Sequence, residues 1–254
     1  MKFPEITRVL YGANPLVDVI CHITFPRILA IDNELPVDFQ EALISRFPLL
    51  ETKNVRKRGS DASADDDAGR GLTYEFASSD KQTMVVLGSD FLGIRTFQYE
   101  RWEIFKEHIE NAIRTLLATY TLSVFTSLSL NYINVVDKDA LGLKDVRWAD
   151  LIRGSLIGPF SETSASDDDL FELHSFASLK IDDGVLRIIS GLVQKTDTKN
   201  TSFLIDNEFV FDESMDADEH KSLAVLRRFN LESGRVFRWC ITDKLHQVLR
   251  PSPL

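Results

Sequence analysis

Residues 99–120 carry the strongest periodic pattern in the chain, and this pattern constrains the fold more than any other feature. Apolar side chains recur there at helical spacing, at Trp102, Phe105, Ile109, Ile113, Leu116 and Tyr120. Such a stripe predicts an amphipathic helix with one buried face. Because that face must be covered, we expect the helix to lie across a sheet.

Short segments that alternate apolar and polar residues supply the sheet. In residues 17–25 the apolar face of the expected strand is Val17, Val19, Cys21, Ile23 and Phe25. Similar patterns predict strands at 72–76, 82–88, 93–99, 127–136, 184–193 and 202–211, and at the end of 164–181. Most of these strands are joined by short turns, which favours antiparallel pairing. The sequence therefore predicts an α+β fold, mainly an antiparallel sheet with helices packed on one face.

The expected elements follow the order β-α-β-β-β-α twice, once in residues 1–122 and again in 123–254. Acidic loops of small residues, SADDDAG and SASDDD, precede the second strand of each half, and FAS recurs at 76–78 and 176–178. We interpret this as an internal duplication of one globular body, although two unrelated α+β stretches could share the order by coincidence. A groove between the halves is then the expected binding site. Residues 51–71 are almost free of apolar side chains and predict a mobile surface loop.

Composition sets limits on where the chain acts and what it binds. Its 254 residues are 44% hydrophobic with a net charge of −10, as in a soluble globular protein. No run of apolar residues is long enough for a membrane span, and the first residues show no signal peptide. Two widely spaced cysteines predict reduced thiols in the cytoplasm. The acidic balance disfavours a nucleic-acid partner, since phosphates attract Lys and Arg.

Motifs for common catalytic and metal sites are missing from the sequence. Cys21 and His22 are adjacent, but neighbours on a strand point to opposite faces, so they cannot act on one atom. The histidines lack HExxH spacing, no CxxC occurs, and the run Asp65–Asp67 lacks the glycine and glutamate of a calcium loop. No phosphate-binding loop and no GxSxG is present. We therefore expect no catalytic residue, no metal ligand and no cofactor.

Two clusters remain as candidate ligand-binding or partner-binding residues. Tyr99, Arg101 and Trp102 stand where an expected strand meets the long helix, and amphipathic side chains there could anchor a partner. The competing interpretation packs Trp102 into the core and leaves Arg101 in water. Asn131 and Asn134 lie on opposite sides of the strand 127–136, where asparagine is uncommon. Asn131 either lines a groove or satisfies a neighbouring loop.

Several segments resemble one protein family. The segments are NPLVDVICHITFP (14–26), YERWEIFK (99–106), LSLNYIN (128–134) and VFRWCIT (236–242). Together they resemble a sporadically distributed, functionally uncharacterised family of prokaryotic proteins of about this length. The resemblance implies one fold over the whole chain and supplies no activity. The family's strand at 127–136 tends to be basic, whereas this chain has Ser127, Asn131 and Val135 there.

These observations favour a non-enzymatic recognition or adaptor protein. It would bind a protein partner or a small ligand, and the family's scattered distribution suggests a mobile-element or host-defence context. The alternative is a metal-dependent nuclease or phosphohydrolase that uses dispersed carboxylates such as Glu172, Asp206 and Glu208.

Overall fold

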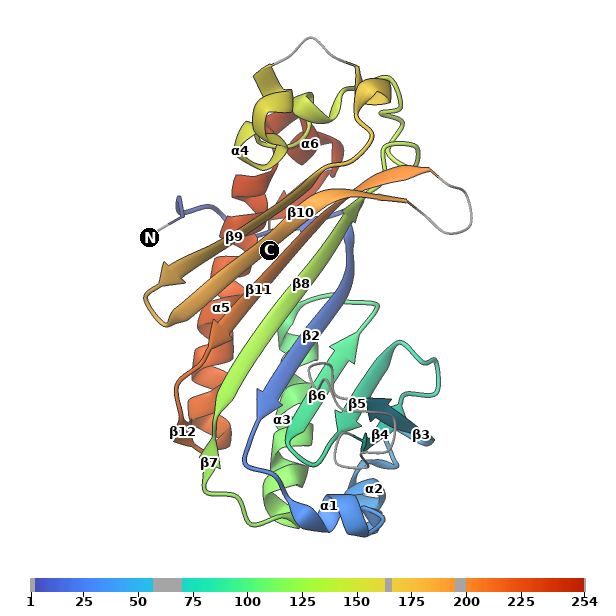
Figure 1. Cartoon of the computed structure of the whole chain (residues 1–254), viewed down its shortest axis with the longest axis vertical. Helices are drawn as coiled ribbons and strands as arrows, with labels where there is room; N and C mark the ends of the chain where they lie inside the picture. Colours follow the sequence, from blue (N-terminus) through green and yellow to red (C-terminus); the bar gives the residue numbers. More distant parts are fainter. Residues whose placement is uncertain (1–2, 57–69, 163–165, 195–199, 254) are drawn as a thin grey trace. The chain divides into compact units, whose positions relative to one another are not determined.

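A nine-stranded sheet dominates the computed structural model, which describes residues 3–56, 70–162, 166–194 and 200–253 (Figure 1). Its strand order is β3-β4-β5-β6-β2-β8-β11-β10-β9. The strands are β2 (Leu16–Thr24), β3 (Leu49–Arg56), β4 (Arg70–Ala77), β5 (Thr83–Leu87), β6 (Phe91–Thr96), β8 (Ser127–Val136), β9 (His174–Ile181), β10 (Gly184–Gln194) and β11 (Thr201–Phe211). Two small sheets pair β1 (Val9–Tyr11) with β13 (Pro251–Pro253) and β7 (Val124–Phe125) with β12 (Met215–Asp216).

Two long helices accompany the sheet, α3 (Trp102–Thr119) and α5 (Glu219–Cys240). The shorter α-helices are α1 (Leu29–Asn33), α2 (Val37–Leu43), α4 (Gly154–Ile157) and α6 (Asp243–Val248). Short 3-10 helices are η2 (Trp148–Asp150), η3 (Gly158–Glu162) and η4 (Asp167–Asp169). No helix among the described residues is long and apolar enough to cross a membrane.

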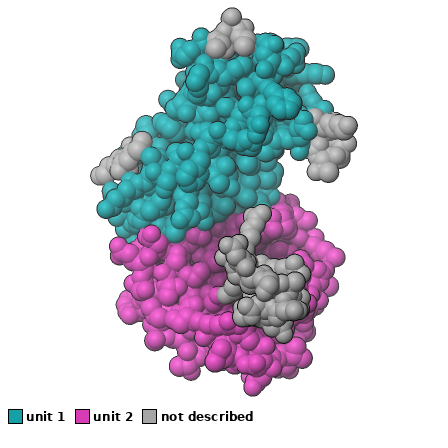
Figure 2. Space-filling model, in the orientation of Figure 1, with its two compact units in different colours: residues 1–19, 130–210, 227–254 teal, residues 20–129, 211–226 magenta. Residues whose placement is uncertain are grey.

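The chain forms two compact units (Figure 2). Unit 1 comprises residues 1–19, 130–210 and 227–254, and unit 2 comprises 20–129 and 211–226. Each unit therefore draws on more than one stretch of the chain. The expected halves, 1–122 and 123–254, remain a prediction.

Unit 2 is organised around α3. The helix buries Trp102, Phe105, Ile109, Ile113 and Leu116, the stripe expected from the sequence, and it packs against α2 and β6. Tyr120, the last residue of that expected stripe, stands one position beyond the helix as its C-cap. Opposite the helix, the strands contribute buried Phe76, Val85 and Ile94. The seam between helix and sheet is mainly apolar, and the helix also buries Thr115 and the polar atoms His108 Nδ1 and Asn111 Oδ1.

Unit 1 is organised around β8 to β11 and the second part of α5. Along β8 the burial alternates without interruption, so Leu130, Tyr132, Asn134 and Val136 face the core. The ring centroids of Phe209 and Phe229 lie 5.6 Å apart, which shows that the core face of β11 packs against α5. The strands β9 and β10 form a hairpin in which Ile181 pairs with Gly184, which leaves a two-residue turn.

The α+β class and the antiparallel sheet are confirmed. The described strand pairs are antiparallel, and strands form at each expected position. The duplication stays a prediction, because β3 has no counterpart among the expected strands of the second half. Between β8 and β9 the helices of the described chain are short turns, among them η2 and α4.

The expected mobile loop at 51–71 needs correction at both ends. Residues 51–56 belong to β3, which pairs with β4 from Leu49 opposite Ala77 to Arg56 opposite Arg70. β3 is an edge strand, and its residues 49–54 are exposed, so it needs no alternation of apolar residues. Charged side chains such as Lys53 are usual on an edge, where they discourage pairing with other chains. Residues 57–69 lie outside the described part of the chain.

Candidate functional site

The first predicted cluster lies at the start of α3 in unit 2. Trp102 is 4% exposed and belongs to the core, while Arg101 is exposed at the N-cap position. Tyr99 makes an edge-to-face contact with Phe105 at 5.9 Å. Trp102 thus packs into the core and Arg101 faces solvent, as in the competing interpretation. Of Tyr99, Arg101 and Trp102, Arg101 is the charged residue that a partner could reach.

The predicted asparagines of β8 occupy opposite faces, as the alternation required. Asn134 is 4% exposed and donates long hydrogen bonds to the carbonyl oxygens of Tyr132 and Ile205. Asn131 lies on the other face, where its amide donates to the carboxylate of Asp206 on β11. Its own Oδ1 is buried and has no partner among the described residues. Asn131 therefore contacts a residue of the neighbouring strand β11, and its role in ligand binding stays a prediction.

Asp206, the partner of Asn131, is a titratable group with a shifted pKa. Burial raises its pKa to about 6, the hydrogen bond from Asn131 opposes that rise, and the charges of Glu208 and Asp18 add to it. Glu208 forms an ion pair with Arg187 at 3.0 Å. Of the three carboxylates in the enzyme alternative, Glu172 stands apart from this arrangement, exposed and paired with His174 at 3.3 Å.

The described residues contain no cluster of three His, Cys, Asp or Glu side chains suited to a metal ion. Both cysteines are buried, and burial raises the pKa of the Cys240 thiol to about 12 and also raises that of Cys21. A thiol in that state is a poor nucleophile, because the thiolate is the reactive form.

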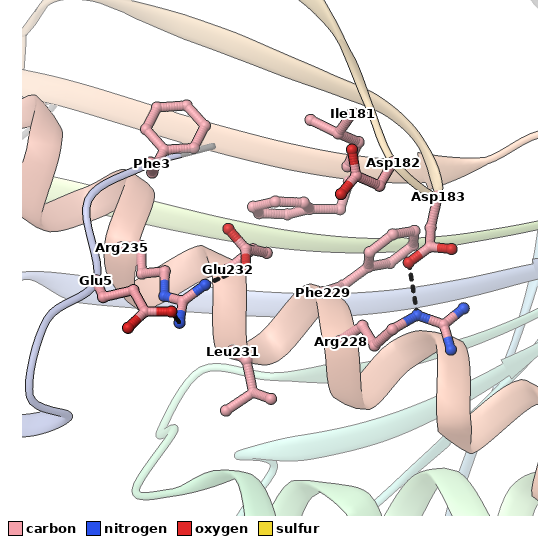
Figure 3. Close-up of a pocket in the computed structure, with 11 residues that line it drawn as sticks. Phe3, Glu5, Ile181, Asp182, Asp183, Arg228, Phe229, Leu231, Glu232 and Arg235 are labelled. Atoms are coloured by element: carbon pink, nitrogen blue, oxygen red, sulfur yellow. Dashed lines mark hydrogen bonds and ion pairs between the residues drawn. The ribbon is translucent and has the colours of Figure 1, made fainter. Parts of the chain in front are cut away.

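A pocket in unit 1 is the candidate ligand site (Figure 3). It encloses about 320 Å³ between the N-terminal segment, the β9–β10 turn and α5. We call it the α5 pocket, and the residues that line it are Phe3, Glu5, Ile181, Asp182, Asp183, Phe209, Arg228, Phe229, Leu231, Glu232 and Arg235. This volume lies at the lower end of the range for small-molecule sites.

Aromatic side chains form the floor of the α5 pocket. Phe209 and Phe229 are almost fully buried and hold each other by the 5.6 Å ring contact. Phe3 is fixed by an edge-to-face contact of 5.5 Å with Trp239. These rings are held by packing, so the pocket wall is formed before any ligand arrives.

Charged side chains form the rim of the α5 pocket. Asp183 binds Arg228 at 2.6 Å, and Glu232 binds Arg235 at 2.6 Å, both drawn as dashed lines in Figure 3. Arg235 also lies 3.7 Å from Glu5. Among the described residues, Asp182 has no ion-pair partner.

The hairpin turn explains the positions of the two aspartates. Asp182 and Asp183 are the whole turn between β9 and β10, and Gly184 follows at a φ of 136°, a backbone conformation that favours glycine. The DDG sequence is therefore the local signal for this part of the pocket. Sequence reasoning missed the pocket, because Phe3 and α5 reach it from opposite ends of the chain.

The α5 pocket contains none of the five predicted site residues. Comparison with known proteins adds no assignment, since no protein-family model, curated protein or solved structure matches the chain.

Proposed function

We propose that this chain is a non-enzymatic recognition protein of the cytoplasm, and that its ligand site is the α5 pocket. The observation that carries the proposal is a preformed cavity of about 320 Å³ whose aromatic floor is surrounded by charged groups. Small-molecule sites are usually apolar with a few polar groups, and this pocket is more strongly charged, since six of its eleven lining residues carry a charge. A concave pocket of this volume suits a small ligand better than the flat surface of a protein partner.

The resemblance to a sporadically distributed prokaryotic family is compatible with this role. The resemblance gives only this context, and the proposal depends on the pocket.

The test is to fill the pocket by replacing one of its lining residues with a larger side chain. Leu231 lines the pocket and is 50% exposed, so Leu231→Trp should occlude the cavity without disturbing the core. Leu35→Trp is the matched control, because Leu35 is 75% exposed in unit 2. Both variants and the parent chain are screened by ligand-observed NMR against one library of small molecules.

We expect ligands that bind the parent chain and Leu35→Trp but not Leu231→Trp. Ligands that bind all three proteins equally, or a library without any ligand, would contradict the proposal. The enzyme alternative is tested by assaying the pure chain with Mg²⁺ or Mn²⁺ against nucleotides and nucleic acids. Activity that disappears in Asp206→Ala and Glu208→Ala would favour the enzyme.

A further inference from the structure

We infer that the ligand of the α5 pocket is a small organic cation, an ammonium group carried on an apolar body, with Asp182 as its anchor. This inference rests on the proposed function, because it names the class of molecule that enters the same cavity. Three properties of the pocket lead to it: the state of its arginines, the position of Asp182 and its accessible apolar side chains.

The arginines of the rim are already neutralised. Asp183 holds Arg228 at 2.6 Å, and Arg235 is held at 2.6 Å by Glu232. Four carboxylates and two guanidinium groups line the described part of the pocket, so negative charge is in excess. An anionic ligand would have to compete with bound carboxylates for each guanidinium, whereas a cation meets an acidic rim.

Asp182 supplies the free charge at this rim. It belongs to the two-residue turn between β9 and β10, so its backbone is held by the strand pairs on both sides. In Figure 3 its carboxylate projects from the turn towards the space above α5. Among the described residues this carboxylate has no ion-pair partner, so it is a ready acceptor for an ammonium N–H, and its exposure to water keeps the strength of that pair modest.

The accessible apolar side chains of the pocket suit the body of such a ligand. Phe3, Phe209 and Phe229 back the cavity but are 5%, 0% and 1% exposed, so a ligand reaches almost none of their ring surface. Ile181 and Leu231 offer apolar contact to a hydrocarbon body. A hydrophilic polyamine would leave this apolar surface unused. A bare divalent cation would prefer a cluster of three acidic ligands, which the described residues do not form.

The test uses three probes that share a phenyl group and differ in charge: 2-phenylethylammonium, 3-phenylpropanoate and 2-phenylethanol. Their dissociation constants are measured by NMR titration of the full chain at low and at physiological salt. We expect the ammonium probe to bind about tenfold more tightly than the alcohol, the propanoate to bind most weakly, and the preference to shrink at higher salt.

Two variants identify the anchor. Asp182→Asn keeps the size of the side chain and removes its charge, so it should reduce the affinity for 2-phenylethylammonium about tenfold and leave the alcohol unchanged. Asp212→Asn is the matched control, an exposed aspartate outside the pocket, and should leave all three affinities unchanged.

The outcomes separate this inference from the proposed function. If 2-phenylethanol or 3-phenylpropanoate binds as tightly as the ammonium probe, and Leu231→Trp blocks it, the pocket is a ligand site but the cation inference is wrong. If the ammonium preference survives in Asp182→Asn, the assignment of the anchor is wrong. If none of the probes binds and the small-molecule library also yields no ligand, both proposals are overturned.

Discussion

The two long helices differ in how their buried polar groups are paired. In unit 2, α3 buries Thr115 among apolar residues, and its His108 Nδ1 and Asn111 Oδ1 are buried without a hydrogen-bond partner among the described residues. In unit 1, α5 buries Asn230 and Ser233 beside Phe229 and Val236. Asn230 accepts a hydrogen bond of 2.9 Å from the hydroxyl of Tyr132 on β8.

The strands that pack on α5 also bury polar side chains. Ser190 on β10 and Asn207 on β11 share the face of Phe209, and their side-chain polar atoms have no partner among the described residues. Buried polar atoms without partners cost stability, and such costs are typical of binding surfaces. Both helices carry buried polar groups, but α5 also lines the described pocket, and this is why we propose that recognition takes place at α5.

The largest expected effect concerns one phenylalanine from each helix. Phe105→Ala in α3 should reduce the free energy of unfolding by about 3–5 kcal/mol, the usual cost of a dry cavity. Phe229→Ala in α5 should cost about 1 kcal/mol less, because the removed ring opens into the α5 pocket and water can enter. Urea denaturation of both variants checks the order. Equal losses of unfolding free energy would mean that water enters the space left by Phe229 no more readily than the space left by Phe105.

Asn207 offers a test of these buried polar side chains. Asn207→Leu replaces a buried amide that has no partner among the described residues by an apolar group of similar size. We expect a gain in stability of about 1–2 kcal/mol, because a buried amide without hydrogen bonds carries a desolvation penalty that the leucine does not. Leu130→Asn on β8, the reverse change at a buried position, is the control and should destabilise the chain. A loss of stability in Asn207→Leu would show that the amide is satisfied by bound water.

We expect a smaller, pH-dependent effect on stability at Asp206. Its folded-state pKa of about 6 exceeds the value of 3.8 expected for an unfolded aspartate, so the folded chain holds this proton more tightly. Its contribution to stability is therefore complete below about pH 4 and is lost as the pH rises through 6. Asp206→Asn should be more stable than the parent at pH 7 by about 1 kcal/mol, a figure reduced because water partly screens the carboxyl. The two proteins should be equally stable near pH 4.

Thermal unfolding between pH 4 and pH 8 measures this difference, with Asp212→Asn as the control that should follow the parent. A stability difference that does not change with pH would place the effect of Asp206 in packing rather than in charge. α3 offers no comparable carboxylate among its buried residues, which are apolar apart from Thr115.

The sequence predicted the elements that bury one regular face. β8 was expected at 127–136, where it lies, and the stripe of α3 was expected residue by residue, apart from Tyr120 at its end. In these elements the period of the apolar residues follows directly from backbone geometry. β3 escaped prediction, because an exposed edge strand takes its hydrogen bonds from β4 and needs no apolar face.

The α5 pocket could not be predicted by the same reasoning. Phe3, Asp182 and Phe229 belong to segments far apart in sequence, and only the packed chain brings them together. The predicted residues Tyr99, Arg101 and Trp102 drew attention because aromatic and basic side chains often form hot spots, yet Trp102 is part of the α3 core. Asn131 was the more informative prediction, because it binds the one carboxylate in the described chain whose pKa is raised this far.

The central claim is that ligands bind at α5 and not at α3. The most direct measurement is a map of backbone amide shifts in the full chain during titration with 2-phenylethylammonium. The account predicts shifts at the β9–β10 turn and along residues 228–235 of α5, with residues 99–105 unchanged. Shifts confined to the start of α3, or no shifts at saturating probe, would contradict it.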